Sequence, residues 1–289
     1  MNVDLRCKLV NNSTPRARAL GSLLREARSG QNLGLRQFAK AIGRDPSVVC
    51  RWETGDRLPQ PTEVARILGR LEVTGRKYDE IMELAYGADA PRWFATTVPE
   101  QRAQLATLLD FEQTATVISD VAPLLIPGLL QTSNYTRAVM TEGGLSPEEI
   151  TTRTAIRAGR REALSRKNPV TLNAYIDEAV LNRRIGTPEI MAEQLGLLHD
   201  MAGWSTVDIR VMPLDSGWHP GLEGSFILID SKTELPVVYR EVYGSGLFLH
   251  DDAEIDSYRA ALARVAGKAM SAEDSLVVIA LAKAGWESP

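Results

Sequence analysis

The chain has 289 residues, of which 44% are hydrophobic and 24% charged, and its formal net charge is −4. This length favours two domains, and this composition excludes a disordered or fibrous chain. The only two cysteines, Cys7 and Cys50, exclude a disulfide framework and a cysteine-rich metal site, and they suit a reducing cytoplasm.

No signal-peptide-like stretch begins the sequence, and the most apolar run, "VAPLLIPGLL", is too short to span a bilayer. We therefore expect a cytoplasmic protein, associated with the nucleoid if it binds DNA, with no membrane partner.

The basic residues are concentrated at one end of the chain. Residues 1–76 contain 14 Lys/Arg and 7 Asp/Glu, whereas the remainder contains 19 and 30. A basic first quarter on an acidic body predicts that this end binds a polyanion. The alternative is chance patchiness of a solvated surface.

Five helices are predicted over residues 15–90, after a flexible tail over residues 1–14. The first helix begins at Pro15, with Ser13 or Thr14 as its N-cap. The second and third are joined by a tight turn, in which Gly43 allows positive φ and Asp45 caps the third helix. Apolar residues at helical spacing mark all of them. The segments after the first are "LRQFAKAIG", "PSVVCRWET", "TEVARILGRL" and "RKYDEIMELAYG".

Two short helices around a glycine-containing turn, inside a compact helical unit, predict a helix-turn-helix. The segments "FAKAIG", "PSVVCRWETG" and "VARILGRL" resemble the Cro/lambda-repressor type of DNA-binding domain, also called the xenobiotic-response-element (XRE) family. The resemblance covers residues 15 to about 75. It implies binding to double-stranded DNA, with the third helix in the major groove, and a homodimer that reads two half-sites.

The resemblance assigns roles to seven residues. Ser47, Val48 and Arg51 are expected to read base edges, and Arg51 is the strongest candidate because a guanidinium can bridge O6 and N7 of guanine. The residues expected near phosphates, which fix register without reading sequence, are Arg36, Gln37, Arg44 and Arg57. A solvated surface is the alternative for each of the four.

Two further positions follow from the resemblance. Glu53 is expected to form an ion pair with Arg28 that clamps the third helix to the first, because an acidic side chain near DNA would be repelled. Many relatives begin the second helix with Thr-Gln, where this chain has Gly34 and Leu35. Leu35 cannot donate the hydrogen bond that the glutamine makes, so the detailed phosphate contacts of the family do not carry over there.

Residues 91–289 are predicted to form a larger α+β domain with a mostly antiparallel sheet. The boundary is placed near the proline-containing "APRWFATTVPE". Five strands are predicted from β-branched runs bounded by Gly, Pro, Asp or Ser. They are "ATVISDV", "VTLNAYID", "TVDIRVMPL", "GSFILID" and "PVVYREVY", and helical patterns lie between and after them.

This region resembles the large C-terminal domain of antitoxin-like helix-turn-helix regulators of high-GC bacteria. The similar stretches include "PLLIPGLLQTSNYTRAVM", "IRVMPLDSGWHPGLEGSFILID" and "VVYREVYGSGLFLHDD". The resemblance implies a small protein partner encoded by an adjacent gene. A small-molecule ligand bound in this domain is the first alternative, and a scaffold that does not bind DNA is the second.

No pattern in the sequence predicts catalysis. His199, His219 and His250 lack the spacing of a zinc site, and no glycine-rich phosphate loop or nucleophile elbow occurs. We expect no enzyme, metal or cofactor.

Residues 126–135 are interpreted as core rather than a partner groove. Trp218 is expected to pack against the sheet, with a ligand or partner site as the alternative. The basic run 153–167 is interpreted as a solvated helix face, with docking to nucleic acid or an acidic partner as the alternative.

Overall fold

The computed structural model describes residues 14–243 and 245–288. They form two compact units, one from residues up to 114 together with 231–255, the other from 115–230 together with 256 onward. Apart from Thr14, the predicted tail 1–14 lies outside the described residues. The predicted boundary between residues 90 and 91 stays a prediction.

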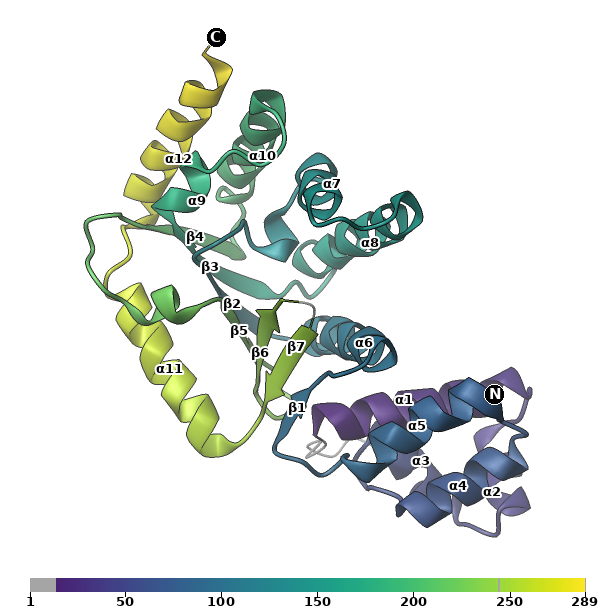
Figure 1. Cartoon of the computed structure of the whole chain (residues 1–289). Coiled ribbons are helices and arrows are strands. Elements are labelled where there is room, and N and C mark those ends of the chain that lie inside the picture. The colour runs from purple at the N-terminus through teal and green to yellow at the C-terminus, as the bar shows by residue number, and fades with distance from the viewer. Residues whose placement is uncertain (1–13, 244, 289) are drawn as a thin grey trace. The chain divides into compact units, whose positions relative to one another are not determined.

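Five helices begin the first unit, as predicted (Figure 1). The Thr14 hydroxyl caps the first by accepting a hydrogen bond from the Ala17 amide, and Pro15 occupies its first position. Their apolar faces meet in one core that includes Leu20, Phe38 and Trp52. The helices are α1 (Pro15–Gly30), α2 (Leu35–Ala41), α3 (Pro46–Thr54), α4 (Pro61–Arg70) and α5 (Gly75–Tyr86).

The first unit also contains a helix and three antiparallel strands in the order β1-β7-β6. They are β1 (Arg92–Phe94), α6 (Val98–Thr114), β6 (Val237–Val242) and β7 (Ser245–Leu249). Trp93 of β1 stacks on Phe248 of β7, with ring centroids 5.9 Å apart. The buried Gln104 amide of α6 donates to the carbonyl oxygens of Trp93 and Gly246, and so fixes the helix to both strands.

The second unit has four strands in the order β5-β2-β3-β4, with β2–β5 antiparallel and β2–β3–β4 parallel. The strands are β2 (Val117–Ala122), β3 (Thr171–Asp177), β4 (Val207–Met212) and β5 (Phe226–Asp230). Antiparallel neighbours predominate over the seven strands, and the α+β class is confirmed. All five predicted strands form, whereas the short β1 and β7 were not predicted.

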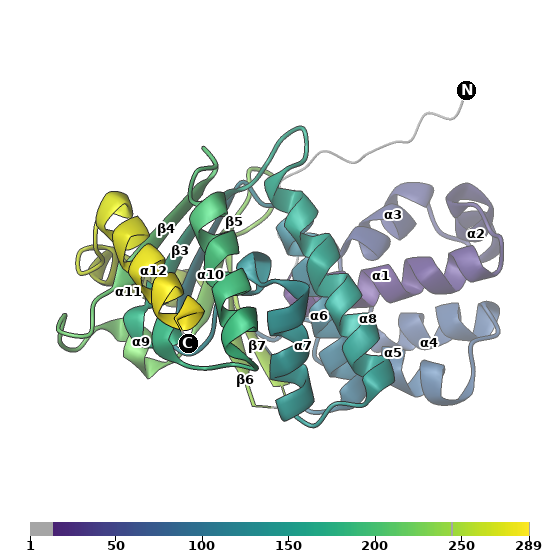
Figure 2. The same cartoon turned by 90° about the horizontal axis from the view of Figure 1, so that it is seen from above.

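Helices cover both faces of these strands, with α7, α8 and α10 on one face and α11 on the other (Figure 1). The view turned by 90° shows α7 and α8 side by side (Figure 2). The α-helices are α7 (Ser133–Glu142), α8 (Pro147–Arg160), α9 (Glu178–Asn182), α10 (Pro188–Met201), α11 (Asp252–Ala266) and α12 (Ala272–Glu287). The 3₁₀ helices are Gly128–Leu130, Arg161–Leu164 and Pro220–Glu223.

The interpretation of residues 126–135 as core is confirmed. Ile126, Leu129, Leu130 and Tyr135 are all buried, and buried amides such as Gln131 satisfy the backbone around them.

The interpretation of the basic run 153–167 as a solvated face is wrong for three of its arginines. Arg160 is buried, and Arg157 and Arg161 both donate hydrogen bonds to Gln131, which also lies inside the unit. Arg157 and Arg161 satisfy acceptors of the buried Gln131, because the segment that follows β2 packs against α8.

The expectation for Trp218 is also wrong. Its side chain is 60% exposed, whereas the adjacent His219 is buried, with Nε2 3.7 Å from the Asp177 carboxylate. Burial lowers the pKa of His219, and the charge of Asp177 partly opposes this shift. The polar histidine takes the inner position because Asp177, at the end of β3, supplies it with a partner.

Candidate nucleic-acid interface

The turn between α2 and α3 has the geometry of a helix-turn-helix. Gly43 has φ +64°, a left-handed conformation that a glycine adopts at little cost. The Asp45 carboxylate then accepts a hydrogen bond from the Ser47 amide at 2.7 Å and caps α3. Hydrogen bonds from the Ser47 side chain and then from its amide, with the nearby positive charge of Arg51, lower the pKa of Asp45. The helix ends at Gly55, with φ +81°. The turn chemistry read from the sequence is therefore confirmed.

Helix α3 lies unusually close to α1 at Gly21. A Cβ atom at this position would lie 2.6 Å from the Trp52 carbonyl oxygen, closer than real contacts allow. Glycine therefore lets the two backbones touch, which fixes the depth of α3 against the core.

The predicted clamp between α1 and α3 is confirmed. Arg28 Nε lies 2.6 Å from Glu53 Oε1 and its Nη2 lies 2.8 Å from Oε2, a bidentate pair. The Glu53 side chain is 3% exposed and that of Arg28 11%. Arg28 also donates to the Leu33 carbonyl oxygen, and its hydrogen bonds to Glu53 raise its pKa. This ion pair therefore fixes the buried side of α3 to α1, and so sets the position of its outer face.

The three predicted base-reading residues lie on the part of α3 that the core leaves uncovered. Ser47 is exposed, and Val48 and Arg51 are half-buried, whereas Val49 and Trp52 on the opposite side are buried. Arg51 Nε donates to the Ser47 carbonyl oxygen at 3.3 Å, within its own helix. The structure therefore brings all three to one exposed face, and their contacts with bases stay a prediction.

The four predicted phosphate-binding residues differ in their surroundings. Arg36 and Gln37 are exposed on α2, and Arg57 is exposed in the segment after α3. Arg44 instead forms a bidentate pair with Glu63 of α4, at 3.0 and 3.1 Å. A phosphate contact by Arg44 would compete with this carboxylate.

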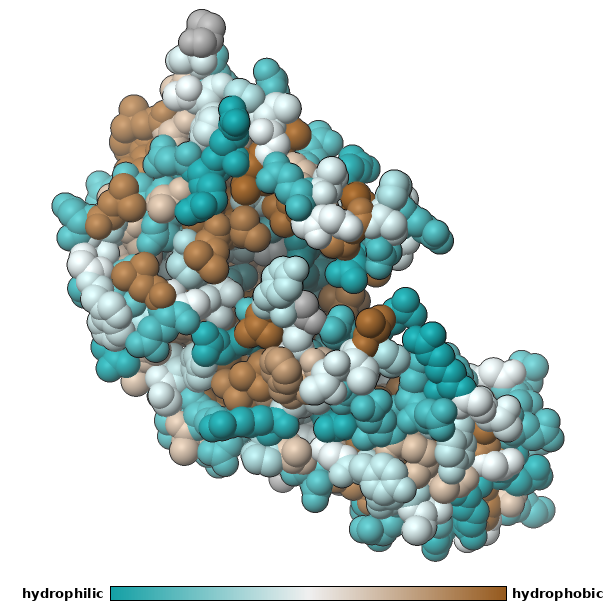
Figure 3. Space-filling view, viewed as in Figure 1, coloured by the Kyte–Doolittle hydropathy of each residue, from teal (hydrophilic) through white to brown (hydrophobic). Residues whose placement is uncertain are grey.

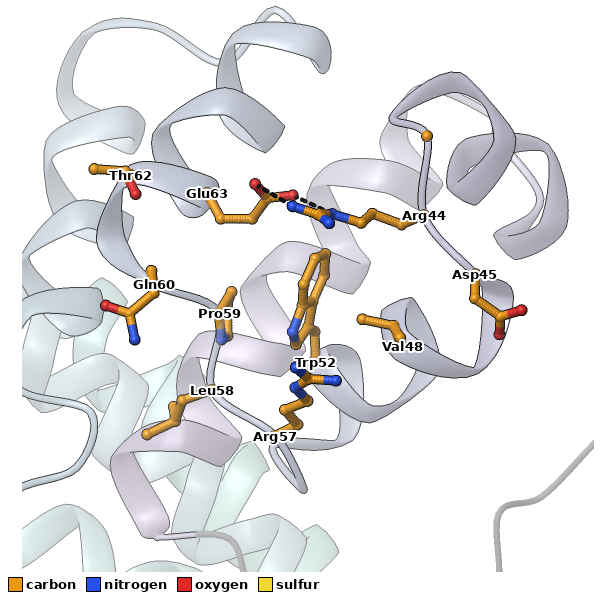
Figure 4. Close-up of a pocket in the computed structure, with 11 residues that line it drawn as sticks. Arg44, Asp45, Val48, Trp52, Arg57, Leu58, Pro59, Gln60, Thr62 and Glu63 are labelled. Atoms are coloured by element: carbon orange, nitrogen blue, oxygen red, sulfur yellow. Dashed lines mark hydrogen bonds and ion pairs between the residues drawn. The ribbon is translucent and has the colours of Figure 1, made fainter.

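A cleft of about 530 Å³ lies between α3 and the start of α4 (Figure 4). Trp52 points into it from α3, Arg57 lies at one side, and the Arg44–Glu63 pair spans the other. The Trp52 indole N–H is buried and has no hydrogen-bond partner among the described residues. The lining residues are Gly43, Arg44, Asp45, Val48, Trp52, Arg57, Leu58, Pro59, Gln60, Thr62 and Glu63.

Sequence reasoning missed Glu63 and the residues of α4 that share this cleft. Glu63 lies in the first turn of α4, where a negative charge is favoured because it interacts with the positive end of the helix dipole. Its pairing with Arg44 depends on how α4 returns across the helix-turn-helix, which no local pattern encodes.

Acidic residues from later in the chain neutralise part of the positive charge of the first quarter. Arg16 pairs with Glu100 of α6, and Arg18 pairs with Asp110 and Glu234. These acidic residues come from later parts of the chain. Arg16 and Arg18 of α1 therefore serve the first unit's own packing, and the DNA contacts of the arginines around α3 stay a prediction.

Family comparisons divide the chain in the same order. A family model described as a helix-turn-helix domain matches residues 19–81, and one described as a domain of unknown function (DUF5753) matches residues 105–280. No curated protein matches the sequence.

Among the described residues, no helix combines the length and apolarity needed to cross a membrane. Nor do three His, Cys, Asp or Glu side chains within residues 14–243 and 245–288 gather as a metal site.

Proposed function

The chain belongs to the family of the domain of unknown function DUF5753, and because a helix-turn-helix domain precedes that domain, we propose that the protein is a sequence-specific, DNA-binding regulator of transcription. The observation that carries the proposal is the outer face of α3. It carries the exposed Ser47 and the half-buried Val48 and Arg51 on the side away from the core, while the Arg28–Glu53 pair fixes the buried side of the helix.

In the proposed complex, α3 lies in the major groove of B-DNA. Arg51 donates to O6 and N7 of a guanine, and Val48 contacts a thymine methyl group. Arg36, Gln37 and Arg57 bind phosphates on either side and set the register. A homodimer reads a palindrome whose half-sites are about one helical turn apart.

Replacing Arg51 with alanine should reduce affinity for a specific site by about 1–3 kcal/mol and relax the preference at one base pair. The loss follows because the bidentate contact to guanine distinguishes that base from the other three. Competition binding with duplexes substituted at each position measures both effects. Arg76→Ala, an equal loss of charge on the exposed face of α5, is the control. Unchanged selectivity in Arg51→Ala would remove Arg51 from base reading.

Replacing Arg57 with alanine should weaken binding to all duplexes alike. One phosphate contact fewer should reduce the slope of log affinity against log salt by about 0.9. Titrations at several salt concentrations, on a specific and a random duplex, measure that slope. A change in base preference would contradict the assignment of Arg57 to phosphate.

For the second unit, we propose an antitoxin-like role, in which a small protein encoded by an adjacent gene binds and modulates the regulator. Exposed apolar side chains support this choice, because they are the usual anchors of protein interfaces. Figure 3 shows apolar patches over the second unit. The large exposed apolar residues of this unit include Leu124, Trp204, Leu214, Trp218, Leu222, Val277 and Leu281.

Capture of genomic fragments by the purified protein, with and without the neighbouring protein, tests the whole proposal. Enrichment of a defined palindrome that changes when the neighbour is added is the expected result. Enrichment that ignores the neighbour would favour a small-molecule ligand instead. No enrichment at all would leave only a scaffold that does not bind DNA.

A further inference from the structure

The cleft beside the proposed DNA-binding face is lined by two carboxylates, of which Asp45 caps α3 and Glu63 belongs to α4. Glu63 lines the same cleft as Val48 and Arg57, opposite Trp52 (Figure 4). An acidic group beside a duplex is repelled by phosphates. Its presence here therefore requires a role other than contact with DNA.

Glu63 holds two arginines at once. Its Oε1 lies 3.0 Å from Arg44 Nε and 3.0 Å from an Arg66 Nη2 that also donates to the Ile42 carbonyl oxygen. The Glu63 side chain is 14% exposed, whereas Arg44 and Arg66 are about half exposed. Hydrogen bonds from Arg44, with the charges of both arginines, lower the pKa of Glu63. The carboxylate is therefore ionised at neutral pH.

The geometry leaves Arg44 poorly available to phosphate. Its Nε and Nη2, the edge that best matches two oxygens of an anion, are both occupied by Glu63. The local group of Arg44, Glu63 and Arg66 carries a net charge of +1 rather than +2. Each phosphate that a cation neutralises releases counterions, so hiding a cation lowers affinity for any duplex.

We propose that Glu63 is a counter-charge that withholds Arg44 from DNA phosphates and so weakens sequence-independent binding. Glu63 acts through Arg44 and is a positioning residue rather than a DNA contact. The inference rests on the proposed function, because it concerns how strongly the same face binds duplexes. Under this proposal Arg44 is a restrained cation, whereas the sequence predicted a phosphate contact for it.

The inference is tested by comparing the full-length wild type with Glu63→Gln. Fluorescence anisotropy measures the affinity of each for a random duplex at several salt concentrations. The variant should bind more tightly at low salt. Its affinity should fall about threefold more than that of the wild type between 50 and 200 mM salt, as expected for one added phosphate contact. Equal affinity and slope, or weaker binding by the variant, would overturn the inference.

Two controls separate this mechanism from a general effect of charge. Glu80→Gln makes the same change in an exposed pair with Arg76 on α5, away from the cleft, and should leave the slope unchanged. Arg44→Gln combined with Glu63→Gln restores the wild-type net charge and should abolish the gain. A gain that persists in the double variant, or that also occurs in Glu80→Gln, would refute the role of Arg44.

A measurement on the wild type covers the case in which Glu63→Gln fails to fold. The side-chain Nε–H resonance of Arg44 should stay unchanged when the random duplex is added, while that of Arg57 shifts. A shift of Arg44 as large as that of Arg57 would overturn the inference. If the wild type binds no duplex at all, the proposed function fails and the inference fails with it. If it binds and Glu63→Gln behaves identically, only the inference fails.

Discussion

Replacing Glu53 with alanine should lower the free energy of unfolding by about 3–5 kcal/mol, because it leaves a largely buried guanidinium without its carboxylate. Arg28 donates two hydrogen bonds to Glu53, and Arg25 lies 3.6 Å from the same carboxylate. Whole domains are stable by only about 5–15 kcal/mol, so this loss is a large fraction of the total. Urea denaturation followed by circular dichroism measures it.

The expected consequence for DNA binding is a loss of all sequence preference, because α3 is no longer held at a fixed depth. Glu80→Ala removes an exposed ion pair on α5 and should cost less than about 1 kcal/mol. Arg28→Met combined with Glu53→Leu should recover much of the lost stability, since an apolar pair needs no desolvated charge. A Glu53→Ala protein as stable as the wild type would show that the clamp contributes nothing.

Local chemistry made the helical part of the fold predictable from the sequence. Proline and N-cap residues mark where helices begin, as at Thr14 and Asp45, and Gly43 and Gly55 mark where they end or turn. These signals act within a few residues, so they hold whatever the rest of the chain does. The five strands predicted from β-branched runs formed for the same reason.

The strands β1 and β7 and the parallel arrangement of β2, β3 and β4 could not be predicted. The strand β1 spans only Arg92–Phe94, too short for an alternating pattern, and it exists because Trp93 stacks on Phe248 far along the chain. Parallel pairing follows from the helices that cross over between β2, β3 and β4. The helical patterns between these predicted strands are typical of such crossovers, but the strand runs themselves do not show which neighbours pair.

The candidate site also combines features that the sequence predicted with contacts that it did not. The outward position of Ser47 and Arg51 follows from helical spacing, and the Arg28–Glu53 pair followed from resemblance. The partners of Arg16, Arg18 and Arg44 were not predicted. Glu100 lies 84 residues after Arg16, Asp110 and Glu234 lie 92 and 216 residues after Arg18, and Glu63 lies 19 residues after Arg44. Charge counted along a sequence therefore overstates the charge that a surface offers to DNA.

Arg18 carries the largest of these hidden interactions. Its Nη2 lies 2.6 Å from Glu234, its Nε 3.4 Å from Asp110, and its guanidinium carbon 4.5 Å from the centroid of the Phe111 ring. The side chains of Arg18 and Glu234 are both 10% exposed. Helix α1 is thereby fastened to α6 and to the segment between β5 and β6, inside the first unit.

Replacing Arg18 with alanine should cost about 3 kcal/mol at neutral pH, because Glu234 is left as a buried carboxylate near Asp110. Burial already raises the pKa of Glu234, and Arg18 opposes that shift, so the pKa rises further without it. A carboxyl group with a raised pKa in the folded state binds more protons folded than unfolded, so stability falls as pH rises through that range. The deficit of Arg18→Ala should therefore be larger at pH 8 than at pH 5.

Thermal unfolding of the wild type and Arg18→Ala across that pH range measures the difference directly. Adding Glu234→Gln to Arg18→Ala should restore part of the stability and remove the pH dependence of the deficit, since no buried carboxylate then remains at that position. A deficit that stays constant with pH would show that Arg18 stabilises the unit through its packing on Phe111 rather than through Glu234. The acidic partners of Arg18 both lie within residues 105–280, which match the family domain. Arg18→Ala therefore tests whether helices α1 to α5 depend on that domain for their stability. A loss of stability confined to the first unit would appear as a separate unfolding transition at lower temperature.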